Sequence, residues 1–129
     1  MRLLLDTNRL GDALNQDAKV ISIIELAIEV FVPFIALAEI QAGFLGGSPK
    51  RLAHNEALLA RLLQMPSVFS LYPDRGTNQI YAQLYDQLRE AGTPIPTNDL
   101  WIASLAVQHN LTLLTRDRHF ARIPQVSRA

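Results

Sequence analysis

Short, continuous apolar runs alternate in this chain with longer segments of helical periodicity. The runs are "RLLLD", "EVFVPFIAL", "SVFSLYPD" and "NLTLLTRD", with a weaker fifth in "PQVSRA". Runs of this length, rich in β-branched, aromatic and leucine side chains, are typical of strands buried on both faces of a parallel sheet. This pattern favours an α/β fold over an all-helical or an all-β one.

The segments between the runs repeat their apolar residues every three or four positions, as helices do. Such segments fall within residues 20–28, 58–63, 80–88 and 102–109. Strands that alternate with helices form βαβ units with right-handed crossovers. The sequence therefore predicts a three-layer α/β fold, in which helices flank a central, mostly parallel sheet of four or five strands.

The length and composition fit one domain over residues 1–129, with 49% hydrophobic residues to build its core. There is no cysteine, so disulfides and thiolate metal ligands are excluded. No apolar run approaches the ~18–20 residues that a membrane span needs, and the opening run is too short for a signal peptide. We expect a cytoplasmic protein with no membrane contact.

Two acids follow predicted strands and a third opens a helix, although the edge of the sheet that this third acid faces does not follow from its position alone. Asp6 ends the first run, Asp117 follows the fourth, and Asp99 opens the helix that leads into the fourth. Open parallel sheets bind ligands beyond the carboxyl ends of their strands. For Asp99 taken alone, a favourable interaction with the helix macrodipole is the preferred explanation, and the functional one depends on the positions of the other acids.

A fourth acid, Glu39, occupies an unusual position in "IALAEIQAGFLGG", a segment expected to be helical after the second strand. Its neighbours on the helix surface are the small or apolar Ile35, Ala36, Ala42 and Gly43. A carboxylate on such a face needs a partner if it is buried. The partner is either an arginine or a cation shared with the other acids.

A divalent cation would relieve the repulsion among four carboxylates that converge on one edge of a sheet. Oxygen ligands without cysteine or a helical histidine pair favour Mg²⁺ or Mn²⁺ over Zn²⁺. None of the histidines, His54, His109 and His119, has a spacing that indicates a metal or acid-base role. Ion pairs with arginine remain the alternative for any single acid.

The four acidic segments together resemble a known family. "LLLDTN", "LAEIQAGF", "IPTNDLWIASLA" and "LLTRDRHF" occur in the order and approximate spacing of the PIN-domain nucleases, and most resemble the VapC-type toxins of toxin-antitoxin pairs. The resemblance implies an acidic metal site, with further polar residues as possible supports. The acids are Asp6, Glu39, Asp99 and Asp117, and the supports are Asn8, Asn98 and Thr115.

The same resemblance implies a function. It is that of a Mg²⁺- or Mn²⁺-dependent endoribonuclease, the toxin component of a type II toxin-antitoxin system, with a cognate antitoxin protein as partner and a tendency to form a homodimer. Arg9, Arg116 and Arg118 flank the acids and are candidate contacts to substrate phosphates, although arginines near the C-terminus also fit a solvated tail. The zero formal net charge argues against a protein that coats nucleic acid by bulk electrostatics.

Two other classes of protein stay open on the residues alone. A phosphatase-like phosphoryl-transfer domain also places an aspartate after its first strand, but it usually needs a late lysine. The only lysines here are Lys19 and Lys50, and neither follows a predicted strand. A non-catalytic α/β binding module, in which the acids merely cap helices and pair with arginines, would not be stabilised by metal.

Overall fold

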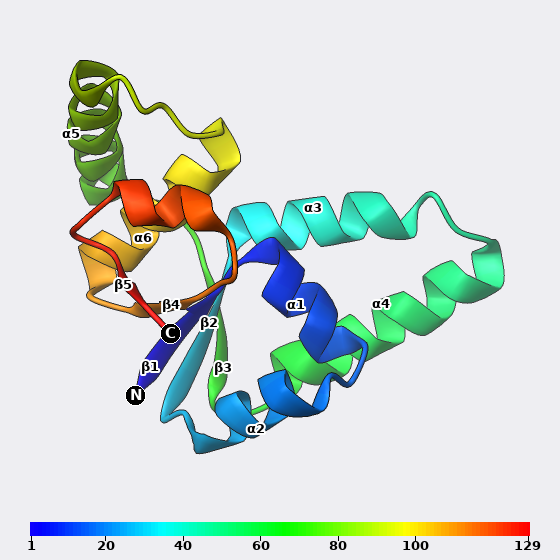
Figure 1. The fold of residues 1–129 in the computed structure, drawn as a ribbon. Helices are drawn as coiled ribbons and strands as arrows, with labels where there is room; N and C mark the ends of the chain where they lie inside the picture. Colours follow the sequence, from blue (N-terminus) through cyan, green and yellow to red (C-terminus); the bar gives the residue numbers. More distant parts are fainter.

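The computed structural model describes residues 1–129 as a sheet of five parallel strands in the order β3-β2-β1-β4-β5 (Figure 1). The strands are β1 (Arg2–Leu5), β2 (Glu29–Pro33), β3 (Val68–Leu71), β4 (Thr112–Leu114) and β5 (Ser127–Arg128). All four pairings are parallel. The predicted sheet is confirmed, including its weak fifth strand.

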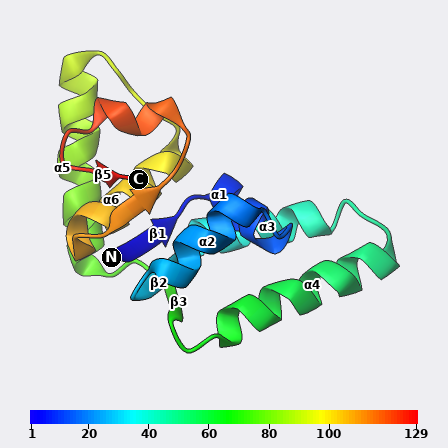
Figure 2. The same cartoon turned by 60° about the horizontal axis from the view of Figure 1, so that its bottom comes forward.

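Helices cover both faces of this sheet, as Figures 1 and 2 show from two directions. One face carries α1 (Thr7–Leu14), α2 (Ala18–Leu26), α3 (Phe34–Phe44) and α4 (Pro49–Gln64); the other carries α5 (Arg75–Ala91), α6 (Thr97–His109) and the 3₁₀ helix η1 (Arg118–Arg122). Successive residues of β1 point into opposite cores. Leu3 and Leu5 belong to the core under α1 to α4, whereas Leu4 belongs to the core under α5 and α6. The three-layer arrangement is therefore the one that the sequence predicts.

The order of the strands determines where the chain reverses direction across the sheet. From β1 the chain proceeds outward to β2 and β3, and then returns to place β4 on the other side of β1. Leu5 pairs with Leu114, and the Asp6 amide donates to the Leu114 carbonyl at 3.3 Å. Asp6 and Thr115 therefore leave the sheet side by side at its switch point, which is where open α/β sheets bind ligands.

The structure differs from the sequence prediction at three elements. The second apolar run is not one strand, because β2 ends at Pro33 and α3 begins at Phe34. The helix expected over residues 20–28 ends at Leu26, which leaves Ile28 outside it and 72% exposed. Helix α1 was not predicted, because "TNRLGDAL" is rich in poor helix formers. No helix in the structure has the length and apolar character that crossing a membrane requires.

Candidate metal centre

Asp6 is a buried acid, only 4% exposed, and it is held by two neighbours. Its Oδ1 accepts a 2.8 Å hydrogen bond from the Arg9 backbone N–H and so caps α1, while its Oδ2 accepts from the Thr115 hydroxyl. Burial raises the pKa of Asp6, and the hydrogen bond from Thr115 opposes that shift. The carboxylate is thus fixed in position but carries a desolvation cost when it ionises.

Thr115 connects this buried acid to Asp117 on the loop that follows β4. Its Oγ1 donates to Asp6 and accepts a 2.9 Å hydrogen bond from the Asp117 backbone N–H. Asp117 Oδ1 in turn accepts a 2.9 Å bond from the backbone N–H of His119, which caps η1. Local backbone capping therefore orients both acids.

Asp99 approaches the same place from the first turn of α6, with its side chain 21% exposed. Its Oδ2 lies 3.0 Å from His119 Nδ1, and the same nitrogen lies 3.1 Å from Asp117 Oδ1. Burial raises the pKa of Asp99, and the negative charges of Asp117 and Glu39 raise it further. His119 thus bridges two carboxylates that would otherwise repel each other.

Glu39 completes the group from α3. Its helical position is confirmed, and its side chain is exposed, so the condition of a buried carboxylate on an apolar face does not arise. Its Oε1 accepts a 2.8 Å hydrogen bond from the hydroxyl of Thr7. Because its charge raises the pKa of Asp99, Glu39 belongs to the same electrostatic cluster.

The donor set of this cluster fits a divalent cation. Ligand atoms of Asp99, Asp117 and His119 all lie within 4.8 Å of one another. Two bonds of ~2.1 Å to one Mg²⁺ span about 4 Å, and His119 Nδ1 already lies 3.0 Å from Asp99 and 3.1 Å from Asp117. The structure does not bring Asp6 and Glu39 into this close group. Asp117 also raises the pKa of Asp6. The site thus concentrates negative charge at one edge of the sheet, which a cation would neutralise.

The predicted polar supports divide into one that contacts an acid and two that do not. Thr115 donates to Asp6. Asn8 is exposed and Asn98 is half-buried, and neither forms a hydrogen bond with a site acid. On α1 the contact comes instead from Thr7, which the sequence analysis did not single out. A threonine beside an asparagine in a first helical turn gives no sequence signal for which of them faces the site.

The three arginines expected to contact substrate phosphates differ in their exposure and in their ion pairs. Arg9 and Arg116 both pair with Asp12, at 3.2 Å and 3.1 Å, and neither forms an ion pair with a site acid. Arg9 is largely buried, which restricts its reach to a ligand, and its Nε has no hydrogen-bond partner. Arg116 and Arg118 are exposed on either side of Asp117, Arg116 on the loop after β4 and Arg118 as the first residue of η1.

His119 was assigned no role from the sequence, and the structure corrects that assignment. Its imidazole lies between Asp99 and Asp117 and contributes the third ligand atom of the cluster. The sequence contained one hint, because His119 lies two residues after Asp117 in "RDRH". The spacing indicates a shared site only when the 3₁₀ turn of η1, which folds this segment back, is known.

These features, an acidic cluster at the switch point of a five-stranded parallel sheet, are those of a PIN domain. The PIN domain family model matches residues 3–126, and the chain belongs to this family. The family expected from the four acidic segments is therefore confirmed.

Within the family the chain is similar to ribonucleases and toxins. It is 32% identical to Ribonuclease VapC4 of Mycobacterium tuberculosis over 74% of this chain and 72% of that protein. It is 32% identical to Toxin FitB of Neisseria gonorrhoeae over 89% of this chain and 87% of that protein. The crystal structure of VapBC2 from Rickettsia felis bound to a promoter DNA fragment superposes with a TM-score of 0.88 at 28% identity, covering 100% of this chain and 98% of that one.

Proposed function

We propose that this chain is a Mg²⁺- or Mn²⁺-dependent endoribonuclease and the toxin component of a type II toxin-antitoxin pair. The observation that carries the proposal is the convergence of Asp99, Asp117 and His119, whose ligand atoms lie within 4.8 Å of one another beyond the carboxyl ends of the strands. The name of the relative Ribonuclease VapC4 supports RNA as the substrate.

In this proposal Asp99, Asp117 and His119 supply the ligand atoms that already lie together, and the carboxylates of Asp6 and Glu39 complete the acidic site that holds the cation. When bound, the cation would lower the pKa of a coordinated water and stabilise charge on the phosphodiester oxygens. Thr115 and Thr7 fix the carboxylates of Asp6 and Glu39 by hydrogen bonds. These side chains orient the ligands in advance, so binding energy is not lost in ordering them.

We further propose a cognate antitoxin and a homodimer as protein partners. The solved VapBC2 structure supports the first, as does Leu45, a 72% exposed leucine just after α3. Exposed Tyr72 and Tyr85 support the second, since they flank an aromatic row through Phe34, Trp101 and Tyr81. Sedimentation velocity of the chain with and without a co-expressed antitoxin tests both; a monomer in both samples contradicts them.

The proposed activity is tested with the purified chain, a single-stranded RNA and either Mg²⁺ or Mn²⁺. We expect cleavage that stops with EDTA, and an Asp99→Asn variant whose rate is lower by more than about a hundredfold, since even groups outside the first ligand shell cost 10–100-fold at metal sites. Asp86→Asn is the matched control, because Asp86 pairs with Arg89 on the exposed face of α5, apart from the cluster.

Metal binding has its own readout in thermal unfolding. A ligand that binds only the folded state adds about 2.7 kcal/mol of stability at a hundredfold excess over Kd. We expect Mn²⁺ to stabilise the wild-type and Asp86→Asn chains but not Asp99→Asn. A wild-type chain that neither gains stability with Mn²⁺ nor cleaves RNA would identify a binding module that lacks metal chemistry.

A further inference from the structure

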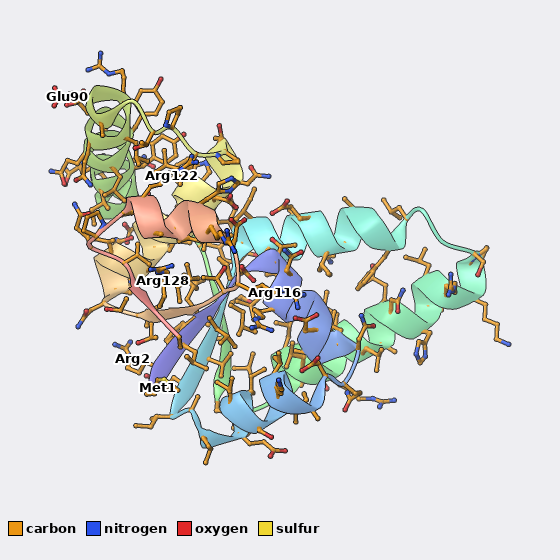
Figure 3. The ribbon with its side chains drawn as sticks, viewed as in Figure 1. Met1, Arg2, Glu90, Arg116, Arg122 and Arg128 are labelled. Carbon is orange, nitrogen blue, oxygen red and sulfur yellow. The ribbon has the colours of Figure 1, made fainter.

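A hollow with three arginines in its lining adjoins the acidic cluster. Its volume is about 450 Å³, and it lies between the loop after β4 and the C-terminal strand β5. Its charged lining consists of Arg116, Arg118, Arg128 and Asp117. Figure 3 labels Arg116 beside α1 and Arg128 on β5. Asp117 therefore lines the hollow and also belongs to the candidate metal centre.

The side-chain charge of this hollow is positive. Its one acidic side chain, Asp117, already interacts through Oδ1 with the backbone and ring of His119. Arg116 is anchored from outside the hollow by Asp12 at 3.1 Å. Arg118 and Arg128 are exposed and form no ion pair within the chain. Two guanidinium groups are therefore available for an anion.

Arg128 belongs to the fold and not to a solvated tail. Its position in β5 is set by pairing with Leu113, and the neighbouring Ala129 amide donates to the Leu113 carbonyl at 2.9 Å. A side chain on a paired strand loses less backbone freedom on binding than one on a mobile tail. Pairing with β4 thus fixes the backbone of Arg128 at the hollow that Asp117 also lines.

We propose that this hollow binds a backbone phosphate of the RNA strand next to the bond that is cleaved, with Arg118 and Arg128 as its phosphate ligands and Arg116 oriented by Asp12. The inference rests on the proposed ribonuclease function. The planar fork of arginine matches phosphate oxygens in a bidentate manner. RNA is favoured over an acidic peptide because the hollow shares Asp117 with the candidate metal centre and offers few apolar side chains, such as Val126, to anchor a peptide.

The test measures RNA affinity as a function of salt concentration, in an Asp99→Asn background so that the RNA stays intact. The probe is a short, fluorescein-labelled single-stranded RNA followed by anisotropy. We expect Arg128→Gln to weaken binding and to reduce the slope of log K against log salt by about 0.7, the value for one lost contact to a single strand. The matched control is Arg61→Gln, an exposed arginine in the last turn of α4, which leads to the opposite edge of the sheet.

Each other outcome decides against the inference in a recognisable way. An unchanged slope in Arg128→Gln overturns it while leaving the proposed function intact, provided that the wild-type chain cleaves RNA. Binding of polyglutamate that depends on Arg128, with an unchanged RNA slope, assigns the hollow to an acidic protein partner and also overturns it. A wild-type chain that neither binds nor cleaves RNA overturns the proposed function and this inference together.

Discussion

At the scale of single residues, the Thr115 hydroxyl connects two of the acids in the candidate site. It donates to buried Asp6 and accepts from the backbone N–H of Asp117. It therefore joins the ends of β1 and β4 through a contact between residues 109 positions apart in the sequence. We expect Thr115→Val, which keeps the shape and removes both hydrogen bonds, to lower the free energy of unfolding by about 1–3 kcal/mol. Chemical denaturation of the metal-free chain measures this loss.

The same substitution changes the pH dependence of metal binding. Burial already raises the pKa of Asp6, and the Thr115 hydrogen bond limits that rise, so the valine variant should raise it further. The cation requires an ionised Asp6; the acid limb of Mn²⁺ affinity should therefore move to higher pH. Titration by calorimetry at several pH values measures the shift, and Thr115→Ser should restore the wild-type profile. An acid limb that does not move would contradict this role of Thr115.

The raised pKa of Asp6 also fixes the sign of its effect on stability. A carboxyl group whose pKa is higher in the folded chain than its unfolded value of 3.8 makes its full contribution to stability at pH values below 3.8. The contribution is lost as the pH rises through the folded pKa. The ionised carboxylate of Asp6 therefore costs stability at neutral pH in the metal-free chain, and a cation bound as proposed would offset this cost.

The residues of the site could be predicted only where chemistry and position agreed in the sequence. Asp6 and Asp117 each follow an apolar run, so their proximity follows from the parallel sheet. Asp99 opens an apolar helix, and the edge of the sheet that it faces could not be derived from that position alone. His119 and Thr7 could not be predicted, because their orientation depends on a 3₁₀ turn and on the facing of a first helical turn. Asp12 was also missed, since its two arginine partners lie on different elements.

At the scale of elements, periodicity separates strands from helices except where both are buried. Residues 29–44 form one nearly continuous apolar stretch that contains β2 and α3, and such a run does not distinguish a buried strand from a buried helix. Pro33 marks the boundary, because it is the last residue of β2 and the N-cap of α3. The glycine after α5 gave a clearer signal, since Gly92 caps that helix in the left-handed conformation.

Two glycines allow the conformational effect to be separated from packing. Gly92 has φ of 69°, and an added Cβ would meet nothing within 4 Å, so Gly92→Ala should cost about 1 kcal/mol of stability from backbone strain alone. Gly43 in α3 also has free space but no positive φ, and Gly43→Ala should stabilise by roughly 0.5–1 kcal/mol. Thermal unfolding of both variants measures the contrast. Shifts of the same sign would show that backbone conformation does not dominate at these positions.

At the scale of the whole molecule, the distribution of charge matters more than its sum. The formal net charge is zero, yet the acids Asp6, Glu39, Asp99 and Asp117 lie at one edge of the sheet, next to the arginine-lined hollow. In the metal-free chain these carboxylates repel the phosphates that Arg118 and Arg128 would attract. A bound divalent cation adds two positive charges where the backbone of RNA has to approach.

We therefore expect Mn²⁺ to strengthen RNA binding, although added salt ordinarily weakens it through screening and counterion effects. The measurement is anisotropy with a labelled phosphorothioate RNA, which resists hydrolysis and keeps the backbone charge, titrated with MnCl₂ or with NaCl at matched ionic strength. NaCl should lower the affinity and MnCl₂ should raise it, and the rise should disappear in Asp99→Asn. Equal weakening by both salts would mean that the cation does not mediate between the acidic cluster and the RNA, and that the arginines bind phosphate independently of it.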